Sequence, residues 1–353
     1  MIHGEGPTRR AVIGAGLGLS VVVTGCAGRD DLTIRRLSFT DLAAWSDADH
    51  EAAMATFLTT RSLARSSDLL RVETTDWISA DLSGPARRAF ETGFAPVLIS
   101  RGAPALFTGY YEPELNGARA PDARYSVPIY RRPHDLTDAP YATRAEIENG
   151  ALAGRGLELL WLEDPVEAFF LQIQGSGRVR LTDGSVARVG FAGKNNHPYR
   201  AIGRILVERG EMTVEQASAG AIRDWLRAQP DGGAALMNEN PSFVFFEERP
   251  LLSPEEGPIG ALGASVTAGR SIAVDPSFHP LGAPIWVEAE GVEGFGGRLM
   301  TAQDIGGAIK GPQRGDLYIG SGAEAGDFAG SLRAEGEMIT LIPRAAAERL
   351  TGA

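Results

Sequence analysis

Glycine and proline interrupt almost every apolar run of this sequence, which limits the length of its helices and strands. The chain has 44 glycines and 21 prolines among 353 residues. Both residues are unfavourable inside helices and sheets and common in turns. In the last third of the chain, the short apolar runs between them are 259–266, 272–274, 285–287, 298–302, 317–319 and 338–342. They predict many short strands joined by tight turns, as in a closed barrel or a sandwich.

The first two thirds of the chain mix helices with strands. The spacing of Met54, Phe57 and Leu58 predicts a helix that opens near residue 46. Thr213 and Gln216 have the spacing of a capping box and predict the start of a helix that contains Ile222. Extended segments are expected at 95–111, 169–174 and 186–189.

The N-terminus has the features of an export signal. Two arginines at positions 9 and 10 precede an uncharged run from 11 to 25, which is too short to span a membrane. The run ends in Val-Thr-Gly directly before Cys26, the only cysteine, and this pattern resembles the lipobox of bacterial lipoproteins. We therefore expect a signal peptide at 1–25, a lipid on Cys26 and a tether at 26–38. A plain signal peptide followed by an accidental cysteine is the alternative.

The charge of the chain and the motifs that it lacks argue against several functions. Without residues 1–25, which carry two arginines and one glutamate, the net charge changes from −11 to −12, so nucleic acid is disfavoured as a partner. The five histidines are scattered, and no metal-ligand motif is present, so we expect no metal and no other cofactor. The sequence also lacks the Gly-x-Ser-x-Gly elbow of serine hydrolases.

Carboxylates are the remaining candidates for chemistry. Asp304 follows a predicted strand and precedes two glycines, while Asp316 opens the next strand. A carboxylate at a strand end beside glycines can act as a general acid on a polymer, although turn or capping aspartates are commoner. Asp275 precedes a proline and is expected to be a turn residue. The aromatic and polar run 107–113 suits either a sugar surface or a buried strand.

Several sequence segments, in the same order, resemble the membrane-bound lytic murein transglycosylase A family. They are 107–113, 172–177, 193–195, 240–246, 302–311, 314–320 and 325–326. The resemblance implies a mainly β fold with several short helices. A double-psi β-barrel domain would consist of residues 39–112 and 247–348, and a second β-domain would be inserted at 113–246. The C-terminal part, 259–343, would be a three-aspartate domain with Asp275, Asp304 and Asp316.

The resemblance also implies a reaction. Family members cleave the β-1,4 bond between N-acetylmuramic acid and N-acetylglucosamine in peptidoglycan without water, leaving 1,6-anhydro-muramic ends. Asp316 would serve as acid and then base, and Asp304 would support it. The family blocks that line the groove give the expected substrate-binding residues Tyr110, Gln174, Ser176, Lys194, Asn195 and Lys310.

Two other functions remain compatible with the sequence. The chain could be a peptidoglycan glycoside hydrolase or a wall-binding module without activity. The expected partners are peptidoglycan strands, the membrane through the lipid on Cys26, and complexes of cell-wall synthesis or hydrolysis. Ala27, with no acidic residue directly after Cys26, favours the periplasmic face of the outer membrane.

The lipobox gives a first prediction. Cys26→Ser removes the thiol that would be acylated, so the protein should leave the membrane fraction while its thermal unfolding stays unchanged. Membrane fractionation of the variant beside the wild type measures this, and undiminished association of the variant would contradict lipidation at Cys26.

Overall fold

The computed structural model describes residues 20–21, 32–214, 216–250, 253 and 256–351. Cys26 and nearly all of the predicted signal peptide lie outside this described part. The strands form two sheets, and the fold is mostly β with several short helices. Within the described residues, no helix is both long and apolar enough to cross a bilayer.

The first sheet is built from strands of the two ends of the chain. Its members are β1 (Ser20–Val21), β2 (Thr33–Arg36), β3 (Phe94–Ser100), β4 (Ala105–Glu112), β11 (Ser271–Ala273), β12 (Pro284–Ala289), β13 (Gly296–Asp304), β14 (Arg314–Ser321) and β15 (Arg333–Pro343). Their order is β1-β2-β3-β15-β12-β13-β11-β14-β4, and β15 also pairs with β4. The last six strands in this order, from β15 to β4, therefore form a closed ring of hydrogen-bonded pairs. Residues 33–36, expected in the tether, instead pair with β3.

Helices cover the outer end of the first sheet. They are η1 (Phe39–Asp41), η2 (Trp45–Asp47), α1 (His50–Thr60), η3 (Arg61–Leu63), α2 (Thr74–Ser79), α3 (Ala86–Gly93) and α10 (Arg344–Thr351). Aromatic side chains pack these helices against the sheet. The ring of Phe57 in α1 contacts the ring of Phe94 in β3 edge to face, with 5.5 Å between the ring centroids. Both rings are fully buried in a single apolar core that continues into the strands.

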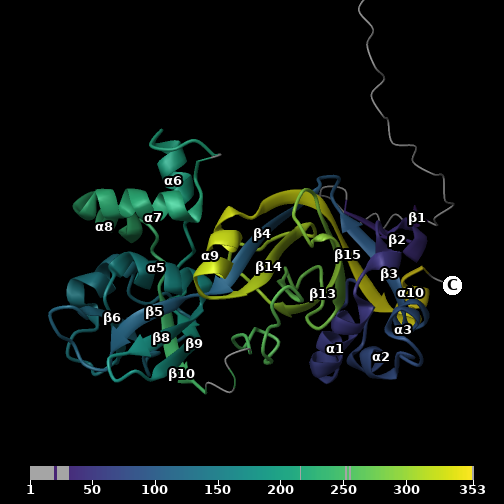
Figure 1. The fold of residues 1–353 in the computed structure, drawn as a ribbon, viewed down its shortest axis with the longest axis horizontal. Helices are drawn as coiled ribbons and strands as arrows, with labels where there is room; N and C mark the ends of the chain where they lie inside the picture. Colours follow the sequence, from purple (N-terminus) through teal and green to yellow (C-terminus); the bar gives the residue numbers. More distant parts are fainter. Residues whose placement is uncertain (1–19, 22–31, 215, 251–252, 254–255, 352–353) are drawn as a thin grey trace, which may run out of the picture.

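The second sheet belongs to the segment between β4 and β11, which we call the insert (residues 114–249). Its strands are β5 (Glu114–Ala118), β6 (Val127–Tyr130), β7 (Glu158–Leu162), β8 (Ser176–Leu181), β9 (Val186–Lys194) and β10 (Val244–Arg249), in the order β10-β9-β8-β5-β7-β6. Its helices are α4 (Arg144–Glu146), the π-helical turn η4 (Ile147–Ala151), α5 (Pro165–Gln174), α6 (Ile202–Glu208), α7 (Ala219–Ala228) and α8 (Pro230–Asn238). Figure 1 shows the insert beside the first sheet, with α9 (Gly322–Ser331) between them.

Three sequence predictions fail at the level of local structure. Segment 169–174 is helical, because Asp164 caps α5, Pro165 occupies its first turn and Gly175 ends it at φ 79°. This helix is buried on both sides, so its apolar run lacks the polar face that identifies an amphipathic helix. Thr213 and Gln216 do form the reciprocal bonds of a capping box, but α7 begins later with Ser218 as its cap. Segment 259–266 contains only an isolated bridge.

A buried carboxylate connects the two sheets. Glu112, the last residue of β4, is completely buried. Arg188 of β9 donates to both of its oxygens, at 2.7 and 2.8 Å, and Arg178 of β8 donates at 2.9 Å. Ser321, the last residue of β14, donates to Glu112 at 3.0 Å. The carboxylate thus links two strands of the insert to two strands of the first sheet.

This arrangement gives a second prediction. Glu112→Gln leaves two arginines without their buried counter-charge, which should cost about 3–5 kcal/mol of unfolding free energy. Glu208→Gln is the control, because Glu208 pairs with Arg204 on the surface and such pairs contribute about 0–1 kcal/mol. Denaturant titrations of both variants would reveal the difference. Equal, small losses would contradict the connecting role of Glu112.

Candidate active site

A three-residue strand brings the two predicted aspartates together. β11 lies between β13 and β14, and its Ala273 is the register partner of Asp304 on one side and of Asp316 on the other. Two strand spacings separate the backbones of these aspartates, about 10 Å. Both side chains are half-buried, so each retains a surface that a ligand can reach.

Asp304 is held by several donors. Its Oδ1 accepts hydrogen bonds from the backbone N–H groups of Ala261 at 3.0 Å and Ile305 at 2.9 Å. The hydroxyl of Tyr110 donates to Oδ2 at 3.2 Å. Burial raises the pKa of Asp304 and the charge of Asp316 adds to this, whereas the three hydrogen bonds act in the opposite direction.

Asp316 has a different environment. Thr108, its register partner in β4, donates its hydroxyl hydrogen to Oδ1 of Asp316. Arg314 in turn donates to the Thr108 hydroxyl oxygen at 2.7 Å. Burial raises the pKa of Asp316, opposed by the Thr108 hydrogen bond and the positive charge of Arg314. A carboxyl group with a raised pKa in reach of a ligand is suited to act as a general acid.

The third aspartate has a structural position. Asp275 is buried and accepts hydrogen bonds from the backbone N–H groups of Ser277 at 3.0 Å and Gly311 at 2.8 Å. Although burial opposes the effect, these bonds lower the pKa of Asp275, which favours the ionised form. His279, completely buried, contacts the carbonyl oxygen of Pro312 through Nε2 at 2.7 Å. Asp275 and His279 therefore fix the loop that leads into β14 and Asp316.

The structure distributes the expected substrate-binding residues over several places. Tyr110 lies at the aspartates, with its ring 5.1 Å from that of Tyr318. Gln174, half-buried at the end of α5, accepts a hydrogen bond from the backbone N–H of Tyr111 at 3.2 Å. Ser176 is buried at the start of β8, whereas Lys194 and Lys310 are exposed.

Asn195 is the exception among these residues. Its side chain is completely buried inside the insert. The amide nitrogen donates to the carbonyl oxygens of Ala142 and Pro241, at 2.9 and 2.8 Å, and the amide oxygen accepts from the backbone N–H of Phe243 at 2.8 Å. These bonds occupy the amide and leave it no surface toward a ligand, so this geometry gives Asn195 a structural role instead of the expected one in substrate binding.

Comparison with known proteins follows the same division of the chain. A family model described as the MltA specific insert domain matches residues 106–247, and one described as the 3D domain matches residues 270–342. The membrane-bound lytic murein transglycosylase A of Vibrio cholerae is 38% identical over 234 residues, 64% of this chain and 62% of that protein.

Solved structures extend the likeness to most of the chain. A membrane-bound lytic murein transglycosylase from Agrobacterium tumefaciens is 34% identical and superposes with a TM-score of 0.81, over 90% of this chain and 99% of that one. The chain belongs to the MltA family. Escherichia coli MltA with bound chitohexaose, at 29% identity, gives a TM-score of 0.69 over 86% of this chain and 90% of that one. The sequence match spans about three fifths of the curated Vibrio relative.

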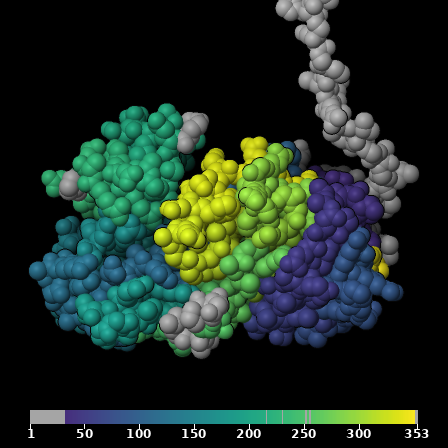
Figure 2. All heavy atoms as spheres, viewed as in Figure 1, coloured from purple at the N-terminus to yellow at the C-terminus, as the bar shows by residue number. Residues whose placement is uncertain are grey.

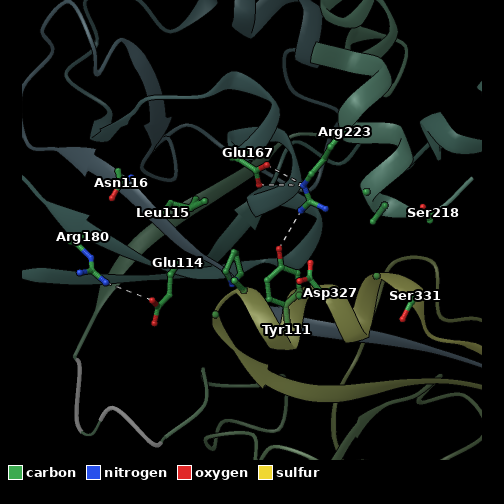
Figure 3. A pocket seen from close by; sticks show the side chains of 17 residues that line it. Tyr111, Glu114, Leu115, Asn116, Glu167, Arg180, Ser218, Arg223, Asp327 and Ser331 are labelled. Atoms are coloured by element: carbon green, nitrogen blue, oxygen red, sulfur yellow. Dashed lines mark hydrogen bonds and ion pairs between the residues drawn. The ribbon is translucent and has the colours of Figure 1, made fainter. Parts of the chain in front are cut away.

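A cavity of about 760 Å³ lies between the insert and α9 of this MltA family member (Figure 2). Figure 3 shows Tyr111, Glu167, Arg223 and Asp327 around it, with Arg223 bonded to both Glu167 and the Tyr111 hydroxyl. Side chains alternate along β4, so Tyr111 faces away from the side on which Thr108 and Tyr110 meet the aspartates. None of the expected binding residues lines this cavity.

Three residues of the site were not expected from the sequence: Thr108, Arg314 and His279. Thr108 lies two positions before Tyr110, so the alternation of a strand places both on one face. Arg314 lies two positions before Asp316 by the same rule. His279 has no such local signal, because its partners, Thr340 and Pro312, are distant in sequence. The described residues contain no group of His, Cys, Asp and Glu that could hold a metal ion.

His279 gives a third prediction. Burial lowers its pKa from 6.5 to about 4. Between these pH values the unfolded chain binds a proton that the folded protein does not, so stability should fall by about 3 kcal/mol from pH 6.5 to pH 4. His279→Gln should flatten this part of the stability–pH curve, whereas His134→Gln, at an exposed position, should not. If the stability of the wild type and of His279→Gln fell equally with pH, the loss of stability could not come from His279.

Proposed function

We propose that this protein is a lytic transglycosylase that cleaves the β-1,4 bond between N-acetylmuramic acid and N-acetylglucosamine in peptidoglycan. The observation that carries the proposal is the half-buried Asp316 carboxyl, whose pKa burial raises, two strands from Asp304. Membership of the MltA family and the likeness to a structure with bound chitohexaose support a glycan substrate.

One carboxyl group is sufficient for the reaction. Protonated Asp316 gives its proton to the glycosidic oxygen as the bond from that oxygen to C1 breaks. The carboxylate then removes a proton from the C6 hydroxyl of the same muramic residue, and O6 forms a bond to C1. The products are a 1,6-anhydro end and a free 4-hydroxyl, Asp316 is again protonated, and no water is consumed.

Asp304 supports this cycle through its charge. Its two backbone donors and Tyr110 stabilise the ionised carboxylate, and that charge disfavours a second ionised carboxylate nearby. Asp304 thereby helps Asp316 to hold its proton and can stabilise the positive charge that develops at C1.

We propose that the glycan contacts Tyr110, Gln174, Ser176, Lys194 and Lys310. Tyr110 lies at the aspartates, and the exposed ammonium groups of Lys194 and Lys310 can donate to hydroxyl or carboxyl groups of the strand. Gln174 ends α5 and Ser176 begins β8, with one glycine between them, and Gln174 accepts a hydrogen bond from the backbone of β4. Asn195 would support this region by bracing the end of β9.

We infer that the first sheet is a double-psi β-barrel. Support comes from the closed pairing of six strands and from the parallel pairs β11–β13 and β14–β4 within it. The barrel domain would comprise residues 39–112 and 247–348, with the inserted domain at 113–246. We also propose a lipid on Cys26 that anchors the protein at the periplasmic face of the outer membrane, in keeping with the name membrane-bound of its relatives.

A fourth prediction tests the assignment of Asp316. Asp316→Asn keeps the shape of the side chain but removes the transferable proton, so release of 1,6-anhydro-muropeptides from purified sacculi should fall by about a hundred- to ten-thousand-fold. Asp304→Asn should be slower than wild type yet active. Both variants should still bind insoluble glycan in a pull-down. Mass spectrometry of the products measures the outcome.

The controls separate the alternatives. Asp183→Asn, at a surface turn, should behave as wild type. Near-normal anhydro product from Asp316→Asn would move the catalytic role elsewhere, first to Asp304. A wild-type product heavier by one water would identify a hydrolase, and binding without any turnover would identify a wall-binding module.

A further inference from the structure

The Thr108 hydroxyl lies in the middle of a short chain of hydrogen bonds at Asp316. It contacts Oδ1 of Asp316 on one side and Nη2 of Arg314, at 2.7 Å, on the other. Arg314 is itself anchored, because its Nη1 donates to the carbonyl oxygen of Leu106 at 3.1 Å. Thr108 is the register partner of Asp316, so the backbones of β4 and β14 fix the distance between the two side chains.

The chemistry of the three groups sets the direction of these bonds. A guanidinium group has no acceptor, so Arg314 must donate to the Thr108 oxygen. The single hydroxyl hydrogen of Thr108 is then directed to Oδ1 of Asp316. Within the described part of the chain, Oδ2 of Asp316 has no hydrogen-bond partner. When Asp316 is protonated, Oδ1 accepts from Thr108, and the proton therefore resides on Oδ2.

We propose that Thr108 is a positioning residue that keeps the transferable proton of Asp316 on Oδ2, and that Arg314 holds Thr108 in this role. This inference rests on the proposed function, since it concerns the acid of that reaction. Without the Thr108 hydroxyl, either oxygen of Asp316 could carry the proton and the carboxyl group could rotate. A fraction of substrate encounters would then meet the proton on the wrong oxygen, which lowers kcat.

Other charged and titratable groups around Asp316 remain in place when Thr108 is changed. Asp304 approaches from β13 and Tyr110 from β4, while Arg314 lies on β14 itself. Arg333 of β15 is the register partner of Thr108 and repels Arg314. Burial raises the pKa of Asp316, and the Thr108 hydrogen bond opposes this rise. Loss of the hydroxyl should therefore raise the pKa of Asp316 further.

The test compares Thr108→Val, which keeps the shape but removes the hydroxyl, with Thr108→Ser, which retains it. Activity on sacculi is followed as the release of 1,6-anhydro product from pH 4 to pH 9. The acid form of Asp316 is required, so activity declines at high pH as Asp316 ionises. In Thr108→Val this alkaline limb should move up by about one pH unit, with kcat about tenfold lower at the optimum. Thr108→Ser should restore both values to near wild type.

Two results would contradict the positioning role of Thr108. An alkaline limb that stays in place in Thr108→Val, or a Thr108→Ser variant as impaired as Thr108→Val, overturns the inference. If Thr108→Val melts far below the wild type, Thr108→Ala removes the same hydroxyl without a bulky replacement and is read by the same criteria. A wild-type product heavier by one water contradicts the transglycosylase proposal instead, and the limb shift still reports on Thr108, because hydrolysis also needs a general acid.

Discussion

The rest of this structure depends on the ion pairs that the buried Glu112 carboxylate forms with Arg178 and Arg188. Glu112 ends β4, and β4 is the strand that leaves the first sheet and continues directly into the insert. Thr108, Tyr110 and Glu112 alternate along one face of β4, so a single strand carries contacts to Asp316, to Asp304 and to the two arginines of the insert. The position of the insert and the geometry of the aspartates are therefore coupled through the backbone of one strand.

Close packing on the opposite face of β4 adds a second constraint. Gly109 lies directly under Ala329 of α9, and a β-carbon at Gly109 would come within 2.8 Å of the Ala329 backbone. α9 can therefore lie flat on β4 and β14, where it forms one wall of the cavity that Tyr111 lines. The strand thus separates this cavity on one side from the two aspartates on the other.

The sequence predicted those parts of the structure that depend on local signals. Short strands in the last third follow from glycine and proline between apolar runs, and the structure contains five strands from β11 to β15 there. The position of α5 was missed because a helix buried on both sides has no polar face. The burial of Asn195 could not be predicted, because its three backbone partners come from segments about 50 residues away. Likewise, Thr108 and Arg314 are separated by 206 residues, and only the parallel pairing of β4 with β14 shows that they meet.

The two aspartates differ in their hydrogen bonds more than in their burial. Burial raises the pKa of both, so burial alone cannot decide which carboxyl group keeps its proton. Asp304 accepts from two backbone N–H groups and a phenol, and these donors stabilise a charge. Among the residues that the structure describes, Asp316 accepts a hydrogen bond only from Thr108, and only at one of its two oxygens. The hydrogen bonds therefore favour the charged form of Asp304 more than that of Asp316. This is the asymmetry that the proposed reaction, with one carboxyl group as both acid and base, requires.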